Sequence, residues 1–283
     1  GDDLNRIYVS TGGVLKEVFR TGVSTSEGNG IVSGVREVSI NSIGNVMFIG
    51  NVSGDDDYRL NVPRLFFTDG VTLTQIARQG ELGPGESEFR VEYFIGRDSN
   101  SQNKVAFSMT LHRNAAPPDN QSSGIYLANG SNITTVLQQG DPVPGGNGTF
   151  GNIAVPVFLN NKGQITFSAP LDGTADQVSD IRGIFFIGSD GVVQTVARHG
   201  MPLAGSTIYT ASSLGDLVDL WGGPLAQFQL SKSDLYQAGM TAINDSGQVP
   251  FWASLADGRS AILLWNSSTE PPDDDVVYAD GFE

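Results

Sequence analysis

Glycines at a nearly constant interval constrain the fold of this chain more than any other feature. Each of them ends a short strand-like run, as in Val196-Ala197-Arg198-His199-Gly200, and leads into a turn rich in Gly and Pro. They stand at Gly22, Gly80, Gly140 and Gly200, which are 58, 60 and 60 residues apart. A fixed period of this length indicates one structural unit repeated along the chain.

A second recurring feature is a turn of the form Asn-x-x-Gly ahead of an alternating apolar run. An Asn side chain can cap its own backbone two residues on, and Gly adopts a left-handed conformation without a Cβ penalty. We therefore expect a structural role for the turn residues Asn41, Gly44, Asn100, Asn160, Gly163, Asn244 and Gly247. Asn103 stands at the Gly position of the second unit, where Asn is the next most tolerant residue.

The runs between these turns predict four strands in each unit of about 60 residues. The units lie near 23–80, 81–140, 141–200 and 201–268, and with residues 5–22 they form one domain over 1–268. The fourth unit contains an insertion at 206–239, in which Ser212–Trp221 resembles a short capped helix. Residues 269–283 read as an acidic C-terminal tail.

Such units predict an all-β fold, a β-propeller with four blades favoured and five as the alternative. The fourth unit lacks its own last strand unless Val276–Tyr278 supplies one. The N-terminal run Val14–Phe19 is a spare copy of that strand. We therefore expect it to close the propeller, because closure removes exposed sheet edges.

The charge balance narrows the range of partners. Lys and Arg total 16 against 31 Asp and Glu, so the formal net charge is −15. Such a surface repels phosphate backbones and anionic lipid, so nucleic acid and membrane surfaces are not expected as partners. No apolar run reaches the roughly 20 residues that a membrane helix needs. The chain holds no cysteine, which excludes disulfides, thiolate metal sites and cysteine nucleophiles.

The repeated phrases also carry a resemblance to a known group. Ile243–Val249 and Val196–Gly200 resemble the LNDxGQVAF and VARxGDxxPG phrases of uncharacterised bacterial extracellular repeat proteins. The resemblance covers residues 14 to 265 and implies a propeller-like architecture without indicating a chemistry. The closing Ala279–Glu283 resembles a short tail on some secreted bacterial proteins, and no signal peptide is visible in the chain. Together these features imply export to the periplasm, the cell surface or the medium.

The loops between the first two strands of the units vary most, and variable loops on a rigid scaffold are where binding usually resides. The candidate ligand-binding residues in and beside them are Asp55, Asp56, Asp57, His112, Asp119, Asp172, Asp176, Asp180 and Arg182. Solvated acidic loops are the favoured interpretation. Ca²⁺ ligation and an acid/base pair acting on a glycan are the alternatives.

Arginines recur at one register, in Arg20, Arg78 and Arg198. A ring of guanidinium groups could face an anionic ligand. We favour a structural role, in which each Arg binds loop carbonyls or carboxylates of the neighbouring unit. His199 occupies a position that accepts other polar residues, so a surface role is favoured over a catalytic one.

No Gly-x-Ser-x-Gly elbow, HExxH motif, Walker loop or dinucleotide-binding fingerprint is present. We therefore expect an exported, non-enzymatic propeller that acts as a binding or surface-interaction module, with a glycan or protein as ligand. The alternative is a carbohydrate-active enzyme, a glycosidase or lyase that uses the loop carboxylates. No catalytic residue and no cofactor other than Ca²⁺ is predicted, and we expect a monomer.

Overall fold

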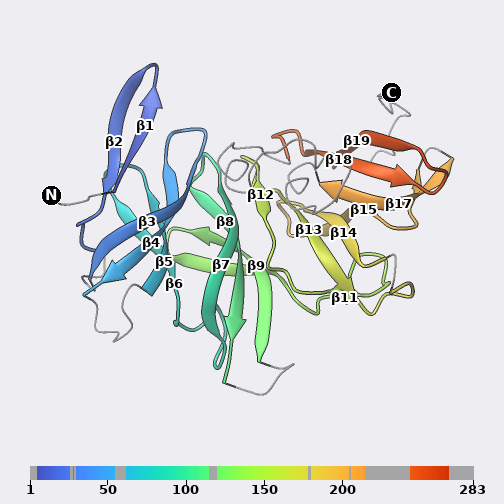
Figure 1. Cartoon of the computed structure of the whole chain (residues 1–283), viewed down its shortest axis with the longest axis horizontal. Coiled ribbons are helices and arrows are strands. Elements are labelled where there is room, and N and C mark those ends of the chain that lie inside the picture. The colour runs from blue at the N-terminus through green and yellow to red at the C-terminus, as the bar shows by residue number, and fades with distance from the viewer. Residues whose placement is uncertain are drawn as a thin grey trace.

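The structure is a computed structural model that describes residues 5–25, 28, 30–54, 62–114, 120–177, 180–203, 205–213 and 243–267. The described residues form an all-β, propeller-like succession of sheets (Figure 1). A hairpin comes first, made of β1 (Arg6–Thr11) and β2 (Val14–Arg20). Four sheets follow in chain order, and they are called the first to the fourth sheet below.

The first two sheets are simple antiparallel meanders in which each strand pairs with the next. The first sheet contains β3 (Ile31–Ile40), β4 (Val46–Ser53), β5 (Val62–Thr68) and β6 (Leu73–Arg78). The second sheet contains β7 (Arg90–Ser99), β8 (Lys104–His112), β9 (Gln121–Asn129) and β10 (Asn132–Gln138). Both agree with the four-stranded unit predicted from the repeat.

The third and fourth sheets depart from that plan in opposite ways. The third has two short first strands, β11 (Thr149–Phe150) and β12 (Val157–Leu159), which both pair with β13 (Ile165–Asp172). β14 (Arg182–Ile187) and β15 (Val193–Arg198) complete it. The fourth contains β16 (Pro202–Leu203), β17 (Ser206–Ser213), β18 (Gln248–Leu255) and β19 (Ser260–Asn266). The described part of the chain ends one residue after β19, so the expected lack of a further strand in this unit stays a prediction.

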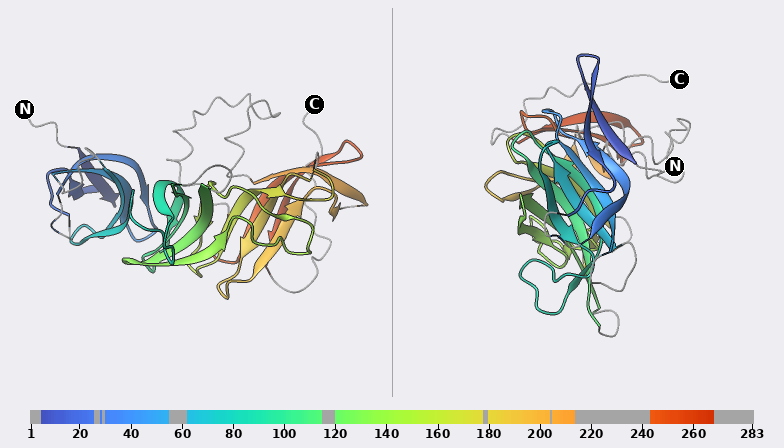
Figure 2. Two further views of the ribbon diagram at one scale, coloured as in Figure 1. Left: turned by 90° about the horizontal axis from the view of Figure 1, so that it is seen from below. Right: turned by 90° about the vertical axis from the view of Figure 1, so that its left-hand side faces the viewer.

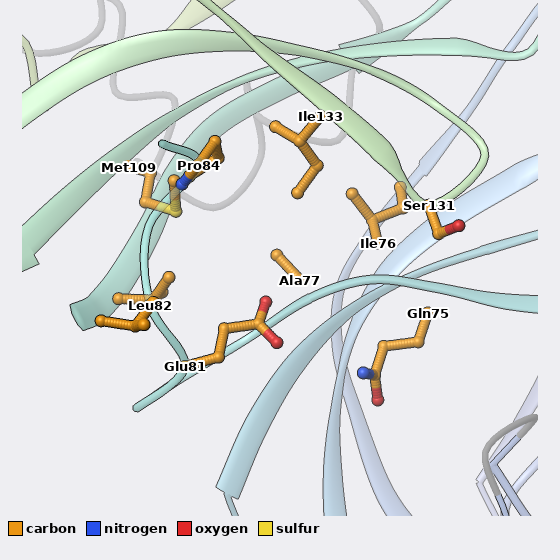
Figure 3. A pocket seen from close by; sticks show the side chains of 10 residues that line it. Gln75, Ile76, Ala77, Glu81, Leu82, Pro84, Met109, Ser131 and Ile133 are labelled. Atoms are coloured by element: carbon orange, nitrogen blue, oxygen red, sulfur yellow. The ribbon is translucent and has the colours of Figure 1, made fainter. Parts of the chain in front are cut away.

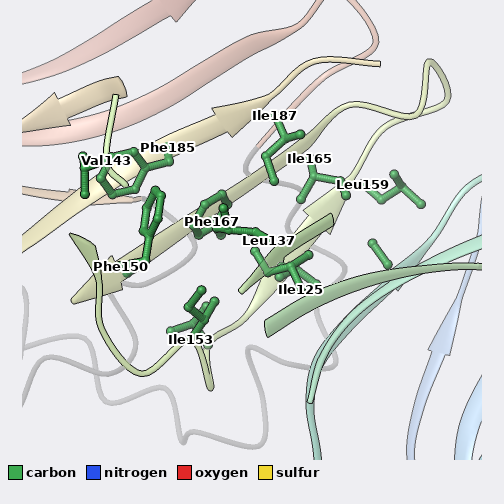
Figure 4. Close-up of a cluster of buried hydrophobic side chains, with 14 of the residues drawn as sticks. Ile125, Leu137, Val143, Phe150, Ile153, Leu159, Ile165, Phe167, Phe185 and Ile187 are labelled. Atoms are coloured by element: carbon green, nitrogen blue, oxygen red, sulfur yellow. The ribbon is translucent and has the colours of Figure 1, made fainter. Parts of the chain in front are cut away.

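Apolar cores lie between consecutive sheets. Alternating residues of each strand point to one neighbouring sheet or the other, which is the period-2 pattern of a strand buried on both faces. Figure 4 shows the core between the second and third sheets, where Phe150 packs between Phe167 and Phe185 with ring centroids 5.9 and 4.8 Å away. The sheets thus follow one another along the long axis of the molecule (Figure 2).

The predicted closure by the N-terminal strand is wrong. In the described chain β2 pairs with β1 alone, and β19 pairs with β18 alone. The hairpin instead buries Ile7, Val9 and Phe19 against the first sheet. It therefore lies at the opposite end of the molecule from β19 (Figure 1). The predicted helix overlaps β17 at Ser212 and Ser213, which are extended, and its remainder lies outside the described residues, as does Val276–Tyr278.

The Asn turns have the predicted backbone. Gly44, Gly163 and Gly247 have φ values of 89°, 79° and 76°, and Asn103 has a φ of 62°. Asn160 illustrates the capping: its Oδ1 accepts hydrogen bonds from the backbone N–H groups two and four residues on, at 3.0 and 2.9 Å. The same pair of bonds occurs at the other three turns.

The Asn side chains also connect the sheets, which the sequence did not indicate. The Nδ2 of Asn41 donates to the carbonyl of Asn100 at 2.8 Å, and the Nδ2 of Asn100 donates to the carbonyl of Asn160 at 3.1 Å. Asn160 continues the series to the carbonyl of Asn244 at 2.9 Å. We call this series the Asn ladder. It holds the four turns side by side and so fixes the stacking of the sheets.

Candidate functional site

The structure gathers part of the predicted acidic set at one end of the third sheet. Asp172 ends β13, Asp176 and Asp180 lie in the segment that follows, and Arg182 begins β14. His112 ends β8 and so belongs to the second sheet. Four predicted residues lie outside the described part of the chain: Asp55, Asp56, Asp57 and Asp119.

A buried ion pair organises this end of the sheet. Arg198, the last residue of β15, donates from Nε to Oδ1 of Asp180 at 3.0 Å and from Nη2 to Oδ2 of the same carboxylate. Both side chains are more than nine-tenths buried. A two-point pair of this kind fixes orientation as well as charge, so the loop that carries Asp180 is tied to the end of β15.

Asn147 connects the ion pair to a second loop. Its carbonyl accepts from Nη2 of Arg198 at 2.9 Å, and its Nδ2 donates to Oδ2 of Asp180 at 3.0 Å. Its Oδ1 accepts from the backbone N–H of Ala175 at 2.9 Å. The backbone N–H of Asp180 in turn donates to the carbonyl of Asp176 at 3.0 Å. We call Asn147, Asp180 and Arg198 the clasp.

The clasp places an exposed acid beside an imidazole. Oδ2 of Asp176 lies 3.8 Å from Nε2 of His199, and the two side chains are 50% and 24% exposed. Nδ1 of His199 lies 2.7 Å from the carbonyl oxygen of Tyr209. Because a carbonyl only accepts, Nδ1 must carry the proton, and in the neutral ring Nε2 is the unprotonated nitrogen that faces Asp176. The Tyr209 ring packs edge-on against the imidazole.

The remaining candidates have plainer surroundings. Arg182 donates from Nε to the hydroxyl of Ser168 at 2.9 Å. Arg20 is exposed on the hairpin, 4.0 Å from Glu17. Arg20 and Arg198 therefore do not converge on one ligand. Arg198 also differs from the favoured interpretation, because its partners belong to its own unit and not to a neighbouring one.

One buried acid was not anticipated. Asp98 lies near the end of β7, and its carboxylate accepts from the backbone N–H groups of Ser99 at 2.8 Å and Leu159 at 3.0 Å. Burial raises the pKa of Asp98 to about 6 despite these two bonds. The corresponding residues of the first and third units, two before the turn Asn, are Ser39 and Phe158. No sequence pattern therefore marked this position.

A hollow of about 310 Å³ lies between the first and second sheets (Figure 3). Ala77 and Val91 occupy the positions that Leu137 and Phe150 occupy between the second and third sheets. The larger side chains fill that second interface, and the smaller ones leave this space open. Its lining mixes apolar side chains with the polar side chains of Gln75, Glu81 and Ser131. None of the predicted ligand-binding residues lines it, so we place the candidate chemistry at the clasp.

Comparison with known proteins identifies the group to which the chain is related. Residues 2–272 match the profile of a family of unknown function, DUF7453. The chain belongs to this family. None of the curated proteins matches it.

Two solved structures are similar to the chain at low identity. The α-L-arabinanase of Penicillium chrysogenum in complex with arabinobiose is 14% identical, with a TM-score of 0.33 over 91% of this chain and 72% of that one. The α-L-arabinofuranosidase Arb93A of Fusarium graminearum, in complex with an iminosugar inhibitor, is 10% identical, with a TM-score of 0.31 over 80% and 67%.

These comparisons contradict the expectation of a non-enzymatic binding module. Both similar structures are named as enzymes, an arabinanase and an arabinofuranosidase. At such low similarity they carry no activity or substrate over to this DUF7453 chain, so the chemistry has to come from its own side chains. The contact between Asp176 and His199 was missed because the two residues lie in separate segments of the third unit and no sequence pattern pairs them.

Two further findings concern partners. Across the described ranges, no cluster of three or more His, Asp or Glu residues is arranged to hold a metal ion. A Ca²⁺ site stays a prediction for the acidic loops outside those ranges. In the same ranges no helix has the length and apolar character needed to cross a membrane.

Proposed function

We propose that the chain is a carbohydrate-active enzyme, a glycosidase or lyase, in which Asp176 and His199 form the acid–base pair. The observation that carries this proposal is the approach of the two side chains at 3.8 Å, with the histidine tautomer set by the carbonyl of Tyr209. Cleavage of a glycan by hydrolysis or by elimination needs a proton to be taken up at one atom and delivered to another. An exposed carboxylate beside an imidazole supplies both roles.

The local geometry favours a reactive pair over a merely solvated one. Neutral His199 presents the lone pair of Nε2 toward the same space as Asp176, so it can accept a proton from a bound hydroxyl, water or C–H group. The protonated ring then gains an ion-pair partner in Asp176, which stabilises the imidazolium. The clasp holds both backbones, because it bonds the residues next to Asp176 and His199 in the sequence, so little reorganisation is required.

Asp180 takes a structural role in this scheme. Its carboxylate is buried and bonded by Arg198 and Asn147, so it has no open position for a substrate. Asp172 is exposed at the same end of the third sheet, where β13 ends. It is the nearest described candidate in the sequence for the second carboxylate that most glycosidases use.

We also propose export, on the resemblance to extracellular repeat proteins. Recovery of the protein in periplasmic or medium fractions would test it.

The activity test is a panel of neutral and acidic polysaccharides scored for product release. New reducing ends without an unsaturated product indicate hydrolysis, and ultraviolet absorbance of an unsaturated sugar indicates elimination. We expect Asp176→Asn and His199→Gln each to lower kcat at least about 100-fold, the usual contribution of an acid–base group. The thermal stability of both variants should stay close to that of the wild type.

Asp190→Asn is the matched control, because Asp190 is an exposed acid in the β14–β15 turn at the other end of the same strands. It should leave turnover unchanged. Full turnover in both Asp176→Asn and His199→Gln, on a glycan that the wild type cleaves, would exclude this pair as the catalytic group. Absence of product from every glycan would count against the enzyme itself.

A further inference from the structure

The hollow between the first and second sheets is a second concave feature of the molecule, on other sheets than the clasp (Figure 3). Its apolar walls come from both sheets and include Ile76, Ala77, Val91, Met109 and Ile133. Gln75, Glu81 and Ser131 add polar side chains to the lining. At about 310 Å³ it has the size of the smaller pockets that bind small organic molecules, which run from roughly 300 Å³ upward.

The repeat indicates what kind of group fits the hollow. In the next interface, between the second and third sheets, the positions of Ala77 and Val91 hold Leu137 and Phe150, which are 4% and 0% exposed. The Phe150 ring packs there against Phe185, with the ring centroids 4.8 Å apart. The first interface therefore leaves open the space that an aromatic side chain fills in the second. An apolar space of such a size takes up an aromatic ring, as an engineered cavity takes up benzene.

Glu81 supplies a polar end to this space. One of its carboxylate oxygens accepts from the backbone N–H of Arg78 at 2.7 Å, as Asp141 accepts from the N–H of Gln138 at 2.8 Å one unit later. The third unit has Met201 at this position, which packs on the core between the third and fourth sheets. Figure 3 shows the Glu81 carboxylate directed into the hollow. A carboxylate offers about four acceptor positions, so Glu81 can accept from a bound molecule as well as from the backbone.

We propose that the hollow binds a small aromatic molecule that carries a hydrogen-bond donor and no negative charge, such as a phenol. The ring takes the place that Phe150 fills in the next interface, against Val91 and Met109, and the donor bonds to the Glu81 carboxylate. That carboxylate and the net charge of −15 disfavour an anionic ligand. Because the clasp belongs to the third sheet, this binding is independent of the proposed catalytic pair.

The experiment titrates the full chain at neutral pH with three probes that share one ring: phenol, toluene and benzoate. Ligand-observed NMR with competition measures the Kd of each probe. We expect phenol to bind with a Kd of about 1 mM or tighter, a modest affinity for so small a ligand. We expect it to bind at least about tenfold more tightly than toluene or benzoate, because a hydrogen bond to a charged acceptor contributes more than a neutral one.

Filling the hollow locates the binding. Ala77→Leu combined with Val91→Phe installs the side chains of the next interface. Phenol binding should be lost in this variant, and its thermal stability should equal or exceed that of the wild type. Val192→Phe is the control, because it adds a ring at a position that is 53% exposed, between β14 and β15 of the third sheet. It should leave the Kd of phenol unchanged, and circular dichroism should show that both variants are folded.

Glu81→Gln tests the polar end without filling the hollow. The amide keeps an oxygen for the N–H of Arg78 but removes the charge, so we expect the preference for phenol over benzoate to fall at least about fivefold. No binding of phenol, binding that survives the filled variant, or an unchanged preference in Glu81→Gln would each overturn the proposal. Equal affinity of the wild type for phenol and toluene would also overturn it, because the hollow would then be a packing space that takes up any ring.

Discussion

The two ends of the third sheet belong to the same strands, but one end carries a turn found in every unit and the other carries contacts that are not repeated. At one end Asn160 and Gly163 repeat a turn that occurs in all four units and joins the Asn ladder. At the other end Asn147, Asp180 and Arg198 form the clasp, for which the second unit offers no equivalent, since Gln138 stands where Arg198 does. The repeated end fixes how the sheets stack, and the unrepeated end carries the contact of Asp176 with His199 for which we propose a catalytic role.

Breaking the clasp should give the largest loss of stability. Arg198→Ala leaves the Asp180 carboxylate buried without its counter-ion, which typically costs about 3–5 kcal/mol. Arg20→Ala is the matched change at the same register, and we expect less than about 1 kcal/mol because Arg20 is exposed and 4.0 Å from Glu17. Chemical denaturation of the two variants measures the difference.

A double variant separates the charge from the packing. Arg198→Met with Asp180→Leu removes both charges, and we expect it to recover most of the stability that Arg198→Ala loses. If Arg198→Ala is no more destabilising than Arg20→Ala, the clasp does not organise this end of the sheet.

The next effect is expected at the Asn ladder. Asn100→Ala removes two turn bonds and the bond to the Asn160 carbonyl, and buried bonds at about 1 kcal/mol each predict a loss of about 2–3 kcal/mol. Asn244 caps its turn in the same way, but its Nδ2 donates to Gln248 in its own turn, and among the described residues it has no bond to another sheet. Asn244→Ala should therefore cost less. Equal losses at Asn100 and Asn244 would mean that the link between sheets adds nothing.

Sequence reasoning succeeded where one physical solution recurs. The repeat interval, the strand order within a unit and the left-handed residue of each turn all follow from local rules, because Gly or Asn three residues after a capping Asn is what a left-handed turn position requires. It failed for contacts that depend on which loop reaches which strand. Asp176 and His199 lie far apart in the chain. The predicted closure of the propeller by Val14–Phe19 was wrong because the apolar side of the hairpin packs against the first sheet instead.

The buried acid at the turn end predicts a pH effect of intermediate size. The pKa of Asp98 is about 6 in the folded chain, against roughly 3.9 when unfolded. The folded state binds this proton more tightly, so the contribution of Asp98 to stability is full below about pH 4 and is lost as the pH rises through 6. The wild type should therefore lose about 2 kcal/mol relative to Asp98→Asn between pH 4 and pH 7.

An exposed acid supplies the opposite sign for comparison. Hydrogen bonding from Arg259 lowers the pKa of Asp257, so its contribution is present at neutral pH and declines on acidification. Parallel pH titrations of the unfolding free energy for Asp98→Asn and Asp257→Asn should diverge from the wild type in opposite directions. Curves that stay parallel to the wild type at Asp98 would rule out its buried proton.

The smallest effect tests the repeated turn most cleanly. Gly163 has a φ of 79°, and a Cβ placed there would meet nothing nearer than the Nζ of Lys104 at 3.9 Å. Any cost of substitution therefore comes from the backbone conformation and not from a clash. Gly163→Val forces a β-branched residue into that conformation, which costs at least about 1–2 kcal/mol. Gly163→Asn should be close to neutral, because Asn103 already adopts a φ of 62° at the same position of the second unit.

Thermal unfolding ranks the two variants, and Gly44, where a Cβ would lie 3.6 Å from Val9, should give the same order. If Val and Asn proved equally costly at Gly163, the turn would depend on the absence of any side chain rather than on φ, and Asn103 would no longer count as an equivalent of Gly163.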